Sequence, residues 1–142
     1  MSTVSSLLSR KNKTSITVLP DTSVVDALKL MAEKNIGSVI VMQADQYLGI
    51  VTERDYSRKI ALKGKNSATT MVSEIMSADL PSVSPADSIE HCMELMTQRN
   101  IRYMPVFENN KLVGIVSMSD VVKETILAQK ETINQLQSYI QS

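Results

Sequence analysis

Two short segments place a hydroxyl residue three positions before an aspartate: Thr52-Glu53-Arg54-Asp55 and Ser117-Met118-Ser119-Asp120. Each follows a Gly-Ile-Val run, so each is predicted to lie where a strand ends and a helix begins. A helix start carries unpaired N–H groups and partial positive charge, which favour phosphate, and a nearby carboxylate can accept hydrogen bonds from both hydroxyls of a ribose. The two motifs therefore predict a site for a nucleotide.

Helix capping alone would also explain these motifs. Thr52 and Ser117 would accept hydrogen bonds from free backbone N–H groups, and Asp55 and Asp120 would accept from the cap, each contributing about 1 kcal/mol. Capping and ligand binding are compatible, so both interpretations stay open.

Catalytic chemistry has little support in the sequence. His91 is the single histidine and falls on the solvent side of a predicted helix, whereas Cys92 falls on its apolar stripe. There is no zinc-type cluster of cysteine and histidine, and four glycines are too few for a glycine-rich phosphate loop. We interpret the protein as a non-enzyme with no catalytic cofactor and no metal. A redox role for Cys92 is the alternative and would need a lowered thiol pKa.

Length and charge further limit the classes of protein to which this sequence could belong. The 142 residues suit one compact globular chain, and 15 basic residues balance 15 acidic ones, which argues against nucleic acid as a partner. No apolar run reaches the roughly 20 residues that cross a bilayer, and one cysteine fits a reducing compartment. We therefore expect a cytoplasmic protein that does not bind membranes. The basic, Ser-rich residues 1–14 leave a transit peptide as an alternative.

The sequence contains an internal duplication. A shift of 65 positions aligns residues 18–62 with 83–127 without a gap, and 13 of the 45 aligned pairs are identical. Upstream, the segment 4–8 is similar to 72–76, which assigns the N-terminus to the first repeat. The expected domains are a first repeat over 1–66, a second over 67–127 and a helical extension over 128–142.

Each repeat predicts the element order β-α-β-β-α. Apolar residues at helical spacing follow Pro20 and Pro85, with Thr22 and Asp87 as the expected N-caps. Hairpins are expected to turn at 44–46 and 109–110, and a second helix begins at each hydroxyl-aspartate motif. The fold class is therefore α+β, and the two repeats are expected to pack face to face about a pseudo-twofold with two clefts between them.

This pattern resembles the tandem CBS domain, or Bateman module, from Val4 to about Leu127. The resemblance rests on the duplicated P-x-x-S, N-I and G-I-V-[TS]-x-x-D elements, and residues 49–59 with Gly64 resemble stand-alone CBS pairs of bacteria and plant mitochondria. It implies a regulatory or sensor module that binds AMP, ADP, ATP, NAD or S-adenosylmethionine in the clefts. A regulated partner protein is implied too, of unknown identity.

The resemblance also implies which residues contact the ligand. Asp55 and Asp120 would hold the ribose, with Thr52 and Ser117 beside the phosphate. Arginine suits bidentate phosphate binding, so we hypothesise that Arg54 and Arg102 contact the phosphates. The opposite repeat has Ser119 and Gly37 at the matching positions, so the two clefts are expected to differ in occupancy. The other implied contacts, to the base and the phosphate entrance, are Lys13, Thr17, Gly37, Ser38, Val39, Ser77, Tyr103, Met104 and Pro105.

The C-terminal residues carry apolar side chains at alternating steps of three and four. Val122, Ile126, Ile133, Leu136 and Ile140 approximate the seam of a coiled coil, with Gln129 in the gap. The seam would pack either on its own repeat or on a second chain, and a homodimer is expected. A structural dimerisation or adaptor protein without a ligand is the alternative function.

Overall fold

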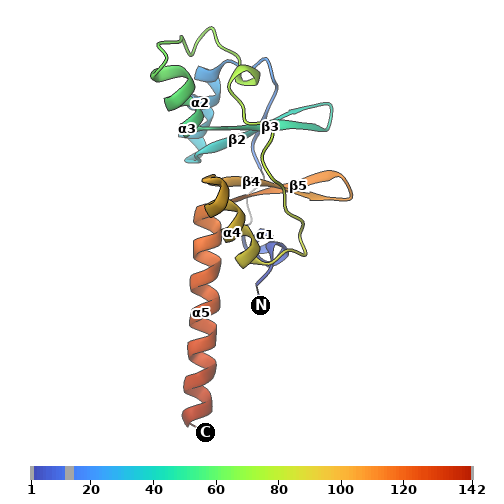
Figure 1. Cartoon of the computed structure of the whole chain (residues 1–142), viewed down its shortest axis with the longest axis vertical. Coiled ribbons are helices and arrows are strands. Elements are labelled where there is room, and N and C mark those ends of the chain that lie inside the picture. The colour runs from blue at the N-terminus through green and yellow to red at the C-terminus, as the bar shows by residue number, and fades with distance from the viewer. Residues whose placement is uncertain (1, 12–14, 142) are drawn as a thin grey trace. The chain divides into compact units, whose positions relative to one another are not determined.

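The structure is a computed structural model that describes residues 2–11 and 15–141. The chain divides into two compact units (Figure 1). The first-repeat unit comprises residues 14–80, and the second-repeat unit combines residues 1–13 with 81–142. Both contain helices and one small sheet, which confirms the α+β class.

The first-repeat unit is built on a three-stranded sheet in the order β1-β2-β3. Strand β1 runs parallel to β2, and β2 forms an antiparallel hairpin with β3 that has a bulge after Val41. The elements are β1 (Thr17–Val18), α2 (Val24–Lys34), β2 (Ser38–Gln43), β3 (Gln46–Thr52), α3 (Glu53–Tyr56), a π-helical turn η1 (Ser57–Ala61) and a 3-10 turn η2 (Val72–Glu74).

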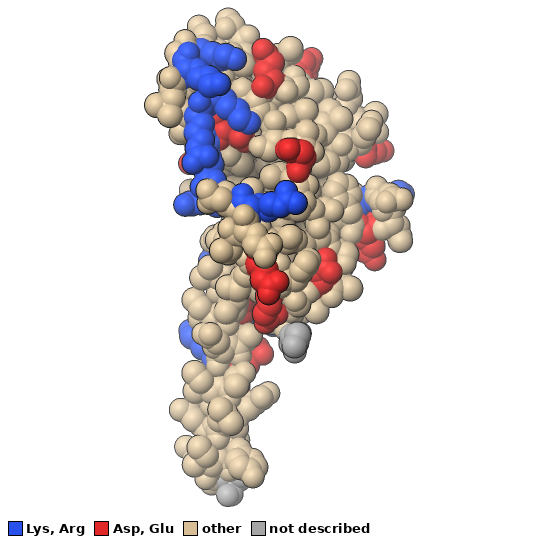
Figure 2. Space-filling view, viewed as in Figure 1, with Lys and Arg blue, Asp and Glu red and all other residues tan. Residues whose placement is uncertain are grey.

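The second-repeat unit repeats this arrangement with a shorter first strand. Its hairpin has a bulge after Val106, the counterpart of Val41, and Val83 forms a single parallel bridge to Val106 in place of a full strand. Its last helix, α5, continues well past α4 and α1 (Figure 1), and the far end of α5 shows almost no charged atoms (Figure 2). The elements are α1 (Val4–Lys11), α4 (Ile89–Arg99), β4 (Tyr103–Glu108), β5 (Lys111–Ser117) and α5 (Met118–Gln141).

The two hairpin turns lie where the sequence predicted them. Ala44 and Asp45 connect β2 to β3, and Asn109 and Asn110 connect β4 to β5, all four with positive φ. Two consecutive residues of positive φ define the turn whose twist matches a β-hairpin. Asparagine and aspartate tolerate this conformation better than most residues.

The helix N-caps lie one residue later than expected. Ser23 caps α2 and Ser88 caps α4, because their hydroxyls accept hydrogen bonds from Asp26 N and His91 N. Asp87 instead accepts a hydrogen bond from Ser84 N in the turn before the helix. The predicted caps Thr22 and Asp87 were therefore wrong, since both candidate positions carry capping residue types and the turn geometry selects between them.

Each hydrophobic core contains a segment from outside its own repeat. Val72 and Ile75 are buried in the core of the first-repeat unit, and Val4 and Leu7 are buried in the core of the second-repeat unit. The backbone contacts correspond as well, since Val72 N donates to Thr22 O and Val4 N donates to Asp87 O. Residues 4–8 and 72–76, called the leading segments below, thus fill equivalent positions in the two cores.

The sequence repeat and the compact unit therefore differ in where residues 4–8 belong. Residues 4–8 precede the first repeat in sequence but pack in the second-repeat unit, and residues 72–76 pack in the first. The leading segments have similar apolar patterns, so each core can accept either one, and only the path of the chain decides which is used. The boundaries 1–66 and 67–127 thus describe the sequence repeat. The compact units are interleaved along the sequence, since residues 14–80 form one unit and the residues on either side form the other.

Candidate functional site

The first hydroxyl-aspartate motif forms a closed capping box at the end of β3. Thr52 is the N-cap of α3, and its hydroxyl accepts a hydrogen bond from Asp55 N at 3.1 Å. The Asp55 Oδ2 atom accepts from Thr52 N at 2.9 Å and from Thr52 Oγ1 at 3.1 Å. Asp55 is only 7% exposed, so the capping interpretation of this motif is confirmed.

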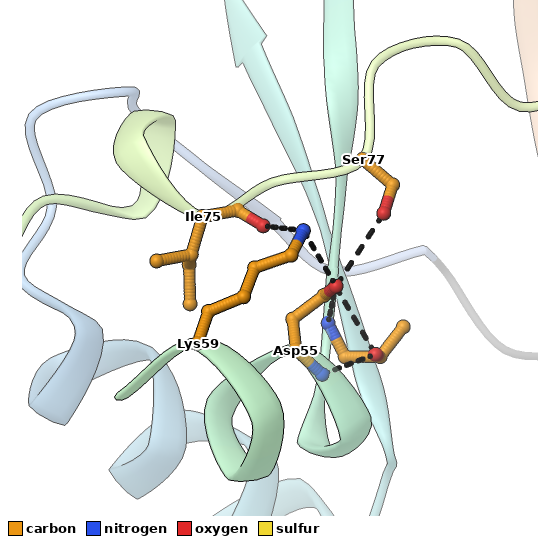
Figure 3. Close-up of polar contacts among 5 residues, drawn as sticks. Asp55, Lys59, Ile75 and Ser77 are labelled. Atoms are coloured by element: carbon orange, nitrogen blue, oxygen red, sulfur yellow. Dashed lines mark hydrogen bonds and ion pairs between the residues drawn. The ribbon is translucent and has the colours of Figure 1, made fainter. Parts of the chain in front are cut away.

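The other oxygen of Asp55 faces two further donors (Figure 3). Lys59, one helical turn later, places Nζ 3.1 Å from Asp55 Oδ1 and donates to Ile75 O at 2.7 Å. Ser77 Oγ lies 3.4 Å from the same Oδ1 atom. Ser77 is held beside the site because its backbone exchanges hydrogen bonds with Ile50 on β3. The carboxylate therefore joins the helix start to the segment that follows η2.

The second motif has the same box with a different cation. Asp120 Oδ2 accepts from Ser117 N at 3.2 Å, and Ser117 Oγ accepts from Asp120 N at 3.1 Å. Lys11 places Nζ 2.9 Å from Asp120 Oδ2 and also donates to Ile115 O at 3.0 Å. This lysine comes from the end of α1, near the start of the chain. Each unit thus sets one lysine against its motif aspartate.

The two lysines occupy different places in the repeat. The residue of the second repeat that matches Lys59 is Glu124, of opposite charge. Glu124 is buried on α5 and pairs with Arg10 of α1, 3.6 Å away. In the first-repeat unit the lysine that pairs with the aspartate comes from the helical segment after the motif. In the second-repeat unit it comes from the end of α1. The lysine thus comes from a different element in each unit and faces a different carboxylate oxygen, Oδ1 of Asp55 and Oδ2 of Asp120.

Electrostatics keep the second aspartate ionised. Burial by itself raises the pKa of Asp120, but hydrogen bonding and charge attraction from Lys11, helped by Ser117, outweigh burial and hold the pKa below its ordinary value. An ionised carboxylate accepts hydrogen bonds only. The site is therefore suited to ligand groups that donate, such as the hydroxyls of a sugar.

The residues expected around the base and phosphate start the second strand of each repeat. Ser38 pairs with Thr52 in the β2–β3 register, and Tyr103 pairs with Ser117 in the β4–β5 register. Just before these strands, Gly37 O accepts from Glu53 N and Arg102 O accepts from Met118 N. Each unit thus brings its own strand start and motif together, and Ser77 joins the first of them.

Other predicted contact residues are less available. Val39 and Met104 are buried in the two cores, so their side chains face away from solvent, and Pro105 is buried as well. Thr17 lies exposed on β1, Arg54 lies in the first turn of α3, and Lys13 falls outside the described residues. The buried residues can offer a ligand only their backbone atoms.

Sequence reasoning missed both lysines as site residues. Lys59 could have been found, because a lysine four positions after an aspartate on a helix lies on the same face. Lys11 had no local signal, since its partner lies at the other end of the sequence. Its place becomes visible only when α1 is seen to pack in the second-repeat unit.

The thiol of Cys92 is not arranged for nucleophilic chemistry. It lies in the core of the second-repeat unit, and burial, together with the charge of Asp87, raises its pKa to about 11. A thiol of this kind stays protonated near neutral pH and reacts slowly. Among residues 2–11 and 15–141, no three His, Cys, Asp or Glu side chains cluster as a metal site.

Comparison with known proteins agrees with this duplicated arrangement. The CBS domain family matches residues 4–62 and 72–126. The mitochondrial CBS domain-containing protein CBSX3 of Arabidopsis thaliana is 34% identical over 98% of this chain and 72% of its own length. A solved Burkholderia ambifaria protein, described provisionally as a signal-transduction protein with CBS domains, is 44% identical with a TM-score of 0.85, over 90% of this chain and 96% of its own.

A second solved structure, the CBS domain protein NE2398, is 40% identical with a TM-score of 0.83 and covers 88% of this chain and 98% of its own. The chain therefore belongs to the CBS domain family and contains two CBS repeats in tandem. No helix within the described ranges is both long and apolar enough to cross a membrane.

Proposed function

We propose that this protein is a non-catalytic regulatory module that binds an adenine nucleotide and acts on a partner protein. The ligand would be AMP, ADP, ATP or NAD, held at the hydroxyl-aspartate motif of one or both units. The observation that supports this most is the buried Asp55 carboxylate, fixed at a strand-helix junction and lined by hydrogen-bond donors. Membership in the CBS domain family supports the class of ligand.

A ribose would have to compete with the donors already present. An ionised carboxylate has about four lone-pair sites, and Asp55 already accepts from Thr52 N, Thr52 Oγ1, Ser77 Oγ and Lys59 Nζ. A ribose diol would therefore replace at least one of them. Lys59 is the donor with the most freedom to move, and its ammonium would then be available to a phosphate. Ligand binding is thus expected to exchange an internal ion pair for an external one.

The second site differs in ways that favour unequal occupancy. Ser117 N and Lys11 Nζ both contact Oδ2 of the Asp120 carboxylate. A ribose hydroxyl could therefore approach Oδ1 without displacing Lys11. The second-repeat unit also has Arg102 beside the motif, where the first has Gly37. We expect the unit with Asp120 to bind the more highly charged nucleotide.

A regulatory role for the nucleotide requires two states with different affinities for it. Ser77 and the Lys59–Ile75 contact connect Asp55 to the segment after η2, so a ligand that displaces either donor would loosen that segment. The proposal includes a cytoplasmic location, in keeping with the single unpaired cysteine. It also includes a homodimer, in keeping with the apolar side chains that α5 exposes.

A structural adaptor without a ligand is the second candidate function. It is favoured by the completeness of the capping box at Thr52 and Asp55, which accounts for the motif with no ligand present. The two functions differ in one measurable property. A ligand that binds only the folded state at 100 times its Kd raises the unfolding free energy by about 2.7 kcal/mol, whereas an adaptor shows no such stabilisation.

Isothermal titration calorimetry on nucleotide-stripped protein tests the proposal, with AMP, ADP, ATP and NAD as titrants. The informative variants are Asp55→Asn and Asp120→Asn, which keep the side-chain shape and remove the charge. Their controls are Glu74→Gln and Asp87→Asn, which alter carboxylates that accept backbone hydrogen bonds elsewhere in the same two units. The controls therefore show what loss of a backbone-bonded carboxylate charge does by itself.

We expect at least one nucleotide to bind, with binding reduced tenfold or more by one motif variant and unchanged in the controls. Absence of heat with every titrant, in folded protein free of co-purified nucleotide, would contradict nucleotide binding and favour the adaptor. Equal losses in the motif variants and their controls would show that the aspartates only cap helices.

A further inference from the structure

The long helix α5 exposes an apolar stripe along most of its length. Val122, Ile126, Ile133, Leu136 and Ile140 are 43% to 78% exposed in this chain. From residue 129 to 141 every position of the helix is exposed. A helical segment of this length has little stability in water unless an apolar face is packed. The stripe therefore requires a partner surface.

The stripe has the spacing of a two-stranded coiled coil. Its members follow steps of four, three, four, three and four residues when Gln129 is included, which is the seven-residue repeat of positions a and d. Isoleucine fills three successive a positions: Ile126, Ile133 and Ile140. Leu136 fills a d position. Isoleucine at a with leucine at d is the combination that favours parallel dimers.

The first part of the opposite face of α5 is covered by α1. Arg10 of α1 lies 3.6 Å from Glu124 and 3.9 Å from Glu131, and both glutamates are at position f, opposite the seam. The helix α1 therefore covers the side of α5 that a coiled-coil partner would leave free. After Glu131 the helix has no charged residue, in agreement with the uncharged far end of α5 in Figure 2.

Charge and polarity favour a second copy of this chain in parallel orientation. Lys123 and Lys130 are at position e, so an antiparallel pair would bring lysines of the two helices toward the same side, whereas a parallel, in-register pair sets Lys123 opposite Met118 and Lys130 opposite Thr125, both at position g and uncharged. Gln129 is the single polar residue of the seam. In a parallel, in-register pair it meets the same amide on the other copy, and the two can bond to each other.

We propose that two copies of this chain associate through α5 as a parallel, in-register coiled coil from Val122 to Ile140. The inference rests on the proposed homodimer and states its surface, orientation and register. It assigns Gln129 the role of fixing the register, because a shift along the seam would place its amide against an apolar side chain: valine, isoleucine or leucine. Nucleotide binding plays no part in it.

Cysteine cross-linking of the full chain tests the proposal. In a Cys92→Ala background, Leu136→Cys places a thiol at a d position, where two parallel, in-register helices come close enough for a disulfide. Ser138→Cys is the matched control, since it is equally near the end of α5 but at position f. Molecular mass by light scattering is measured beside it for the unmodified chain, for Ile133→Glu on the seam and for Ser138→Glu off it.

We expect a dimeric mass for the unmodified chain and at least tenfold faster disulfide formation for Leu136→Cys than for Ser138→Cys. Ile133→Glu is expected to weaken the dimer at least tenfold and Ser138→Glu to leave it unchanged. Both residues are exposed, so neither variant should prevent folding. A dimeric mass with equal cross-linking at the two positions would overturn the coiled coil while leaving the homodimer, and a monomeric mass would overturn both. Nucleotide titration of Ile133→Glu reads out the proposed ligand function separately.

Discussion

Lys11 and Asp120 form an ion pair of 2.9 Å between the first helix of the chain and the start of the last one. In the first-repeat unit the motif aspartate is paired instead by Lys59, four positions after Asp55 on the same helical segment. A local contact in one repeat is thus reproduced by a long-range contact in the other. The leading segment 4–11 therefore completes the site as well as the core of the second-repeat unit.

Removal of the Lys11 ammonium should make the free energy of unfolding less dependent on pH in the acidic range. The folded-state pKa of Asp120 is lowered, so the pair stabilises the fold above the unfolded pKa of about 3.9 and this contribution is lost as the pH falls through the folded pKa. Lys11→Met should lower the unfolding free energy by about 1 kcal/mol at pH 7, and by progressively less between about pH 5 and pH 2.

Urea unfolding at several pH values checks this, with Lys111→Met as the control because Lys111 is an exposed lysine of the same unit. An equal loss of stability at pH 7 and pH 2 would mean that Lys11 contributes through packing instead of charge.

Alanine at the two matching strand glycines should have unequal effects. A Cβ at Gly49 would lie 2.8 Å from Ser77 O, a backbone atom, whereas a Cβ at Gly114 would meet Leu8 Cδ2, the end of a side chain, at 3.0 Å. Side-chain ends can move and backbone bonded to a strand cannot. Gly49→Ala should therefore lower the unfolding free energy by about 1–3 kcal/mol, and Gly114→Ala by less, measured by urea unfolding.

Because the added Cβ of Gly49→Ala would displace Ser77, this variant should also weaken the binding of any ligand that contacts Asp55. A greater destabilisation by Gly114→Ala would show that the segment around Ser77 is not held against β3 as described.

Truncation of Val4 or Val72, one valine from each leading segment, should destabilise a different unit in each case. Val4 and Val72 are fully buried, the first in the core of the second-repeat unit and the second in that of the first. Each valine to alanine change should lower stability by about 2 kcal/mol. Hydrogen exchange should accelerate in β4 and β5 for Val4→Ala, and in β2 and β3 for Val72→Ala. Each variant serves as the control for the other, and acceleration in the opposite pattern would contradict the interleaved arrangement.

The Cys92 thiol should resist modification while the protein is folded. With full burial and a pKa raised to about 11, it should react with a disulfide reagent at pH 8 at least a hundredfold more slowly than in urea-unfolded protein. The released thiolate is followed by absorbance. Comparable rates in the folded and unfolded protein would revive a redox role for this residue.

Loss of Arg102 should weaken the binding of a phosphate-bearing ligand. The residue is exposed directly before β4, and its carbonyl oxygen accepts from Met118 N at the start of α5. Arg102→Ala should lower nucleotide affinity about tenfold, which is the scale of one charge-assisted hydrogen bond. Arg99→Ala, also exposed but at the end of α4, is the control. Unchanged affinity in Arg102→Ala would remove this residue from the site.

The sequence by itself determined the features that depend on neighbouring residues. The turns at Asn109 and Asn110 and the boxes at Thr52–Asp55 and Ser117–Asp120 follow from residues within four positions of one another, and the duplication makes the same local pattern visible twice. Such contacts form wherever the backbone takes the local conformation that those residue types prefer. Even here the caps at Ser23 and Ser88 were displaced by one residue, because adjacent hydroxyl and carboxylate residues can serve equally well.

Only the tertiary structure decided which leading segment enters which core and which lysine faces which aspartate. Val4 and Val72 have similar neighbours in sequence, so no local preference distinguishes their destinations, and the choice depends on chain path and on how each core is filled. Lys11 is positioned by the packing of α1 within the second-repeat unit. Side-chain packing over long sequence separation is the physical reason, since its energy exists only once distant segments are brought together.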